Sequence, residues 1–508
     1  RDFCLSRGLG DVYKRQLLVL VGLAGYGFHR LSIVYLYWKN RNNKPQPKAR
    51  FQELPVVTVQ LPMFNEKFVV DRLLESVAAL DYPQDKLEIQ ILDDSTDDTT
   101  EQCYRKVEEL KSRGFDAVCI HRTDRTGFKA GALEAATKVA KGEFLLILDA
   151  DFVPEPDLLQ KTIHFFTDEN VGLVQTRWGH INREYNLLTR IQGMYLDGHF
   201  AMEQTARNRS GRFFTFNGTA GIWRKCVIGD AGGWSHDTLT EDMDLSYRVQ
   251  LRGWRFIYLN DVVTPAELPV DMDGFKSQQH RWTKGSIQVC QKILLDIWRS
   301  NAPLKAKVEA TTHLTCNYSY LLLALLCFLV YPICTQRIPE NETVFMWFVN
   351  VALFFMTSVA VCIFYMSAQI VVRPKSWWKE LPYLPLLLTL SVGMAVNNAK
   401  AVLEAIFGHQ SAFVRTPKYG VDRKEDRRHV SQLKRNGYRA IKSVVIPVLE
   451  IACGTFFLNL IIIMIRQGHY LSPILMIPFL GFYYTGFCSL GRMISNLLPA
   501  KQTAKAKN

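Results

Sequence analysis

Two aspartates that could take part in chemistry, Asp149 and Asp151, directly follow the apolar run 144–148. Such a run indicates a buried strand, and side chains two residues apart at its end point to the same side. Hard divalent cations bind carboxylate oxygens together with the phosphate oxygens of a substrate. The pair is therefore a candidate metal site, although a solvated turn shows the same pattern.

Polar residues also follow two other apolar runs. Asp93 and Asp94 come after the run 89–92, where a carboxylate could recognise a nucleotide and the following residues could cap a helix. Asn65 and Glu66 end another run and open a helical segment. A helix N-terminus binds anions, so this position suits a nucleotide, and a capping turn begun by a proline is the alternative.

A lysine and two acids lie in short polar segments before helical runs. Lys129 stands in Gly-Phe-Lys-Ala-Gly, where it could neutralise a pyrophosphate or be simply solvated. Glu241 and Asp242 follow a glycine-rich loop. Acids in a first helical turn are favoured by the helix dipole, but a carboxylate here could also act as general base toward an attacking sugar hydroxyl.

The most specific pattern is Gln278-x-x-Arg281-Trp282. A tryptophan offers a flat apolar face for a sugar ring, and the neighbouring guanidinium can bind phosphate oxygens in a fork. The alternative is a Trp/Arg anchor at a membrane surface.

These residues lie within or just after a segment of mixed strand and helix character. Val69, Leu73, Val77 and Leu80 recur at helical spacing. Strand–helix alternation predicts a largely parallel sheet, whose active site lies at the carboxyl ends of the strands. The predicted strands are 56–61, 87–92, 144–148, 171–176 and 255–259.

Composition places this domain beside a membrane. The chain has 508 residues, 48% of them hydrophobic, and a net charge of +13. The segment from His409 to Lys442 contains ten Lys or Arg residues and three acids, and an apolar segment follows it. This position favours a basic cytoplasmic loop over nucleic-acid binding. The eleven cysteines form no C-x-x-C pair, which leaves zinc and thioredoxin-type sites without support.

Apolar segments lie on both sides of the soluble domain. Residues 17–38 end in aromatic residues followed by Lys39 and Arg41, which predicts a membrane helix with the next domain in the cytoplasm. We interpret 384–402 as an interfacial or re-entrant helix, because it carries Pro385 and a full crossing would put the basic loop outside. The other candidate spans are 314–334, 344–372, 444–465 and 471–490.

The expected fold is an α/β GT-A (Rossmann-like) cytosolic domain inserted between transmembrane α-helices. The expected parts are a leader whose native origin is open (1–16), a transmembrane helix (17–38), the GT-A glycosyltransferase domain (55–270), interfacial helices with the Gln-x-x-Arg-Trp motif (271–313), transmembrane and interfacial helices (314–405), a cytosolic gating loop (406–443), two transmembrane helices (444–496) and a tail (497–508).

In their order along the chain, these motifs resemble those of processive, inverting GT-A glycosyltransferases of the cellulose-synthase superfamily, including cellulose synthase-like glucan and mannan synthases and bacterial relatives. The segment 413–418 is similar to the family's gating loop, although Arg415 stands where cellulose synthases carry Val. This departure puts cellulose itself in doubt as the product.

The resemblance implies a role for each motif. Asp242 is the catalytic base, Asp149 and Asp151 hold Mg²⁺ or Mn²⁺, and Thr416 and Lys418 belong to the gate. The implied nucleotide-sugar-binding residues are Asn65, Glu66, Asp93, Asp94, Lys129, Asp149, Gln278 and Arg281, and the implied acceptor-binding residues are Trp282, Asn217, Gly218, Thr219 and Glu241.

The function implied is polymerisation of sugar from a nucleotide-sugar, with UDP-glucose favoured and GDP-mannose the other donor, into a β-glucan or β-mannan. The partners implied are the donor, a polysaccharide acceptor, the lipid bilayer and an accessory export subunit, with no nucleic acid. The expected location is a bacterial inner membrane, or a Golgi or plasma membrane. The alternatives are a non-processive transferase acting on a membrane lipid and a degenerate receptor or scaffold, against which the intact acids argue.

Overall fold

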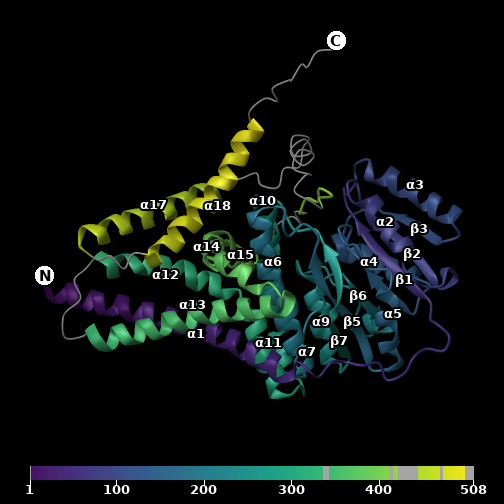
Figure 1. Cartoon of the computed structure of the whole chain (residues 1–508), viewed down its shortest axis with the longest axis horizontal. Helices are drawn as coiled ribbons and strands as arrows, with labels where there is room; N and C mark the ends of the chain where they lie inside the picture. The colour runs from purple at the N-terminus through teal and green to yellow at the C-terminus, as the bar shows by residue number, and fades with distance from the viewer. Residues whose placement is uncertain (1, 336–342, 411–415, 422–443, 469–472, 498–508) are drawn as a thin grey trace, which may run out of the picture.

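The computed structural model describes residues 2–335, 343–410, 416–421, 444–468 and 473–497. An α/β domain lies on one side, and a bundle of long helices that includes α1, α12, α13, α17 and α18 lies on the other (Figure 1). Helix α10 (Met272–Arg299) stands between them. Most of the predicted basic loop, 422–443, and the tail from 498 lie outside the described residues.

The α/β domain is built on a seven-stranded sheet with the order β3-β2-β1-β4-β6-β5-β7. Neighbouring strands are parallel except β6, which runs antiparallel to both β4 and β5. The prediction of a largely parallel sheet is thus confirmed, while β3 and β6 were not predicted. The strands are β1 (Val57–Met63), β2 (Leu87–Asp93), β3 (Asp116–His121), β4 (Phe144–Ile147), β5 (Val171–His180), β6 (Gly221–Arg224) and β7 (Arg255–Ala266).

Helices cover both faces of this sheet and bury two apolar cores. In β4, Phe144 and Leu146 point into one core, while Leu145 and Ile147 point into the other, as the two-residue period of a strand requires. The first core includes α2 (Val70–Ala78), α3 (Thr99–Ser112) and α5 (Leu158–Thr162), and the second includes α4 (Phe128–Val139), α8 (Lys225–Asp230) and α9 (Glu241–Leu251).

Two described helical segments, Lys14–Asn40 and Val445–Arg466, are long and apolar enough to cross a membrane. Two bent pairs would raise the number to four if each is one span: Leu304–Thr315 with Tyr318–Tyr331, bent by 52°, and Trp377–Gly393 with Ala395–Ile406, bent by 41°. The second pair contains the segment interpreted as re-entrant. Residues 2–16 of the expected leader are the first part of helix α1.

The bounds of the helices around the sheet domain and the membrane segments follow. They are α1 (Asp2–Asn40), α6 (Leu187–Asp197), α7 (Thr205–Arg209), α11 (Leu304–Thr315), α12 (Tyr318–Thr335), α13 (Thr343–Val372), α14 (Leu384–Gly393), α15 (Ala395–Ile406), α17 (Val445–Arg466) and α18 (Pro473–Leu497), with a π-helix at Gly198–Gln204.

A buried ion pair fixes α10 to the C-terminal helices. Lys276 of α10 lies 2.5 Å from Oε2 of Glu450 in α17, and the two side chains are 1% and 0% exposed. The same ammonium donates to the carbonyl of Thr485 and to Oγ of Ser489, both in α18. A buried charge requires such partners, so helices α17 and α18 hold in place the helix that carries the Gln-x-x-Arg-Trp motif.

Candidate active site

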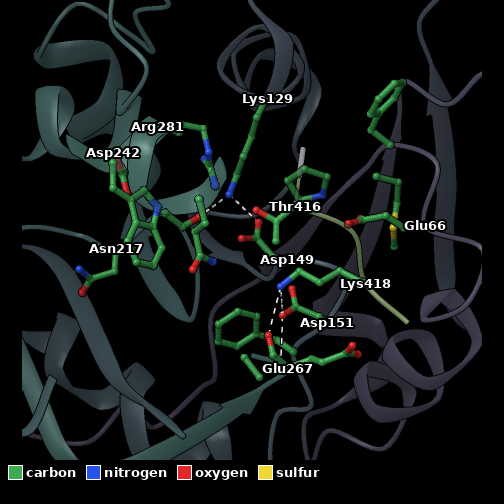
Figure 2. A pocket seen from close by; sticks show the side chains of 18 of the residues that line it. Glu66, Lys129, Asp149, Asp151, Asn217, Asp242, Glu267, Arg281, Thr416 and Lys418 are labelled. Atoms are coloured by element: carbon green, nitrogen blue, oxygen red, sulfur yellow. Dashed lines mark hydrogen bonds and ion pairs between the residues drawn. The ribbon is translucent and has the colours of Figure 1, made fainter. Parts of the chain in front are cut away.

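A cavity of about 1270 Å³, including the space at its open mouth, lies where the carboxyl ends of β1, β2 and β4 meet α10. The end of β7 and part of the predicted gating loop close it from another side. Figure 2 shows labelled acids and cations of this set, among them Asp149, Asp242 and Lys129, gathered around this space. The predicted residues that line it are Glu66, Asp94, Lys129, Asp149, Asp151, Asn217, Gly218, Glu241, Asp242, Gln278, Arg281, Trp282, Thr416 and Lys418.

Each aspartate of the Asp149-x-Asp151 pair is bound by a lysine. The ammonium of Lys129 lies 2.5 Å from Oδ1 of Asp149 and also donates to the carbonyl of Gly218 at 2.8 Å. The ammonium of Lys418 lies 2.5 Å from Oδ2 of Asp151 (Figure 2). Burial by itself lowers the pKa of Lys129, but Asp149 and Glu241 outweigh it and raise this pKa above the ordinary lysine value.

The same two aspartates fit a divalent metal. Both line the cavity, and their hard oxygen atoms are the donors that Mg²⁺ or Mn²⁺ prefers. Among the described residues no group of three or more His, Cys, Asp or Glu could form a complete metal site. A cation here would therefore be held by the two carboxylates together with phosphate oxygens of the donor and water, as is usual for Mg²⁺.

The two adjacent acids after β2 separate into different roles. Asp93 is fully buried and accepts hydrogen bonds from the Ser95 backbone and the Thr100 hydroxyl, while its Oδ2 lies 2.7 Å from Nδ1 of His121. The structure therefore does not bring Asp93 into the cavity. Asp94 does line it.

The carboxylate of Asp94 is oriented by a cation. The guanidinium of Arg122 donates to both oxygens of Asp94, at 2.8 and 2.6 Å. Such a bidentate contact fixes the plane of a carboxylate. Asp94 is therefore the acid of this pair that is placed to recognise a nucleotide.

Asn65 and Thr219 brace the site and are not among the cavity-lining residues. Asn65 has a positive φ of 53° and its side-chain oxygen accepts from the backbone of Thr96, which ties the loop after β1 to the loop after β2. Thr219 is fully buried, and its hydroxyl accepts the backbone N–H of Asp149 at 2.8 Å. Both residues thus position neighbours that face the cavity.

Asp242 lies in the first turn of α9, beside Glu241. Burial raises the pKa of Asp242 to about 7, and the neighbouring charge of Glu241 contributes in the same direction. A carboxylate with a pKa near neutrality can take up a proton during a reaction at physiological pH. Gly218, at φ +80°, lies so close that a Cβ there would be 3.1 Å from Oδ2 of Asp242.

Aromatic residues form the wall next to Asp242. Trp282 of α10 lines the cavity together with Trp178 from the end of β5. The ring of Trp178 is stacked on Phe200, with 4.6 Å between ring centroids. Trp178 was not predicted from the sequence, although an aromatic residue near the end of a predicted strand was a usable signal. Two indoles that line one cavity suit the flat face of a sugar ring.

Arg125, which lines the cavity near Asp94, was not predicted from the sequence. Its guanidinium lies 3.4 Å from the ring centroid of Phe64, the residue before Asn65 and Glu66. Arg125 belongs to no acidic or glycine-rich motif, so local pattern did not single it out.

Comparisons with known proteins agree with this geometry. A family model described as "Glycosyltransferase like family 2" matches residues 55–285, and one described as "Cellulose synthase" matches residues 221–467. The chain is 42% identical over 286 residues to glucomannan 4-beta-mannosyltransferase 2 of Arabidopsis thaliana, covering 53% of each chain. It is 40% identical over 277 residues to glucomannan 4-beta-mannosyltransferase 1 of Oryza sativa subsp. japonica, covering 54% of this chain and 53% of that relative.

The chain thus spans about half the length of the curated relatives it matches. Among solved structures, mannosyltransferase PcManGT from Pyrobaculum calidifontis, in complex with GDP-Man and Mn²⁺, gives a TM-score of 0.53 at 21% identity. The match covers 71% of this chain and 99% of that one, and it shows the shared GT-A fold. The two family models, for family 2 glycosyltransferases and for cellulose synthase, overlap and together match this chain across residues 55–467.

Proposed function

We propose that the chain is an inverting hexosyltransferase that builds a β-mannan or glucomannan backbone from GDP-mannose. The observation that carries this proposal is that the predicted base, the Asp149-x-Asp151 pair and the Gln-x-x-Arg-Trp motif all line one cavity. The names of the curated relatives favour mannose. The expectation that UDP-glucose is the preferred donor finds no support in these comparisons.

The reaction is a single in-line displacement. Asp242 accepts the proton of the acceptor hydroxyl, whose oxygen attacks the anomeric carbon from the face opposite the diphosphate. The bond between that carbon and the diphosphate oxygen breaks, and the nucleoside diphosphate leaves with the electron pair. An α-linked donor therefore gives a β-linked product.

Cationic side chains stabilise the charge that develops on the leaving diphosphate. Lys129, Arg281 and Lys418 all line the cavity, and fixed cations there act without the reorganisation that water would need. Asp149 and Asp151 would hold a divalent metal, which would supply further Lewis-acid stabilisation of the same group. Asp94, fixed by Arg122, is placed to bind the nucleoside.

The acceptor is a growing polysaccharide, bound on the side of Asp242, Asn217 and Trp282. Trp178 and Trp282, which both line the cavity, favour a sugar chain over a lipid-linked monosaccharide, because an indole face can bind a sugar ring of the acceptor. The enzyme is an integral, multi-pass membrane protein whose catalytic domain faces the cytoplasm, and an accessory export subunit is a further expected partner. The apolar helices Lys14–Asn40 and Val445–Arg466 support the membrane location.

The test is a donor panel. Detergent-purified full-length chain is incubated with radiolabelled GDP-mannose or UDP-glucose in the presence of Mn²⁺ or Mg²⁺. We expect a polymer from GDP-mannose that endo-β-mannanase digests and β-glucanase does not. A product that stays in the organic lipid fraction would favour the lipid-modifying alternative, and polymer from UDP-glucose alone would refute the choice of donor.

A further inference from the structure

The segment 416–421, here called the docked segment, is packed against the rim of the active-site cavity. Thr416 is 4% exposed, Tyr419 is 1% exposed and Val421 is fully buried. Tyr419 and Val421 form a small apolar cluster with Tyr185 and Val270. The docked segment is therefore a packed part of the site.

One carboxylate receives the backbone of this segment. The N–H of Tyr419 donates to Oε1 of Glu267 at 3.0 Å, and the N–H groups of Gly420 and Val421 donate to Oε2 at 3.0 and 3.2 Å. Successive backbone N–H groups that converge in this way form a nest for an anion. Gly420 has φ +68°, and a Cβ there would meet the carbonyl oxygen of Phe68 at 2.8 Å, so the turn requires glycine.

Glu267 is also joined to the metal-binding aspartate through its own backbone. Its N–H donates to Oδ2 of Asp151 at 3.2 Å, and its carbonyl accepts from the ammonium of Lys418 at 3.3 Å. The same ammonium lies 2.5 Å from Asp151. Glu267 thus contacts both partners of the Lys418–Asp151 ion pair, which lie beside it in Figure 2. Its side chain meanwhile accepts from the backbone of residues 419–421.

We propose that Glu267 is a positioning residue whose carboxylate binds the amides of residues 419–421 and so holds Lys418 beside Asp151 at the donor site. The part concerning the donor rests on the proposed function. The docking itself does not depend on it, because it consists of contacts within the protein.

A carboxylate suits this position because its contacts come from donors: the three backbone N–H groups and the guanidinium of Arg72, whose Nη2 lies 3.5 Å from Oε2. A carboxylate has two acceptor oxygens, and hydrogen bonds to an ionised acceptor are stronger than neutral ones. In Glu267→Gln one oxygen becomes an NH₂ group, which presents hydrogen atoms to N–H groups. In Glu267→Asp the charge remains, but the side chain is one carbon shorter.

The experiment is hydrogen–deuterium exchange of the donor-free, full-length protein in detergent, followed in peptides that cover 416–421. In Glu267→Gln we expect exchange of the amides 419–421 to quicken at least about tenfold, since charged hydrogen bonds protect them. Peptides of β1 should exchange as in wild type. The matched control is Glu88→Gln, which removes another buried carboxylate that accepts a backbone N–H, from Lys141, away from the cavity.

A second variant approaches the same contact from the segment. Gly420→Ala should quicken exchange in 416–421 with Glu267 intact, and combining it with Glu267→Gln should add nothing further. If Glu267→Gln does not fold, Glu267→Asp provides the comparison and should give intermediate protection. Unchanged exchange in the folded Glu267 variant would overturn the proposal, as would an equal effect of Glu88→Gln.

Enzyme kinetics separate this proposal from the proposed function. If the chain transfers sugar, Glu267→Gln should raise the donor KM several-fold, with a smaller change in kcat at saturating donor, because the donor must then bind before the segment docks. If wild type shows no transfer from any donor, the proposed function fails while the exchange measurement still decides the docking. A fall in kcat with an unchanged KM would contradict the role given to Glu267.

Discussion

The sharpest expectation concerns the pH dependence of sugar transfer. Asp242 accepts a proton only when it is ionised, and its pKa is about 7, chiefly because burial disfavours the charged carboxylate and secondarily because Glu241 lies beside it. With a single group of this pKa, kcat/KM should be about one tenth of its plateau at pH 6 and about one hundredth at pH 5.

The substitution that tests the cause is Glu241→Gln. It removes the negative charge that is the second contribution to the raised pKa, so the pKa of Asp242 should fall and the acid limb should move to lower pH. The assay measures initial rates of labelled mannose incorporation between pH 5 and 9 with donor well below KM, because kcat/KM then reports the free enzyme. The result is the pH at which kcat/KM falls to half of its plateau. The plateau value itself is not compared, because Glu241 also lines the cavity and its loss can change the rate directly.

Asp242→Asn supplies the control for this reasoning. It should lower the rate by about 10²–10⁴, and the remaining activity should lack the acid limb. A wild-type profile that is flat between pH 6 and 8 would refute the assignment of Asp242 as base. An unmoved limb in Glu241→Gln would refute the electrostatic cause.

Other expectations follow from the same contacts. In the folded protein Asp242 keeps its proton up to about pH 7, whereas in the unfolded chain it loses this proton near the ordinary value of 3.8. The stabilising contribution of the group is therefore complete below pH 3.8 and is lost as pH rises to about 7. Asp242→Asn should accordingly raise the melting temperature at pH 8 but not at pH 3.5. Chelation should abolish transfer, and Asp151→Ala should weaken Mn²⁺-dependent binding of a fluorescent donor analogue; transfer that persists in chelator would remove the metal role. Trp282→Ala should reduce elongation more than donor hydrolysis, and an equal loss of both would indicate a structural role. Lys276→Met should lower the melting temperature sharply, since breaking a buried pair costs about 3–5 kcal/mol, and adding Glu450→Met should restore much of the loss; no recovery would contradict the pairing.

Much of the site could be predicted because its acids stand at the ends of strongly apolar strands. The run 144–148 has a single interpretation as a buried strand, and parallel strands bring their carboxyl ends to one edge. Asp149, Asp151 and Asp94 therefore had to lie near one another. Lys129, at the start of the helix between β3 and β4, follows from the same topology.

The sequence could not separate Asp93 from Asp94. Their environments are decided by His121 and Arg122 at the end of β3, and β3 was not predicted, because its half-exposed pattern lacks a strong apolar alternation. The two acids look alike in the chain, but only Asp94 lines the cavity.

The role of Glu267 could not be predicted from local sequence pattern, for a different reason. Its side chain binds amides that lie 152 to 154 residues further along the chain. No periodicity or motif links positions so far apart, and backbone donors leave no mark in the side-chain sequence. Such contacts can be recognised only in the folded structure, where the helices that follow Glu267 in the chain bring the docked segment back to the sheet.

The ion pair between Lys276 and Glu450 also has a consequence for how the protein is made. The two partners are 174 residues apart, so at a synthesis rate of about 5–20 residues per second the lysine waits on the order of 10–30 seconds for its carboxylate. During this time the ammonium is present without its partner, in the helix that stands between the α/β domain and the helical bundle. An unfinished or truncated chain therefore keeps an exposed charge where a finished one has none, a difference by which cellular quality control can recognise incomplete molecules.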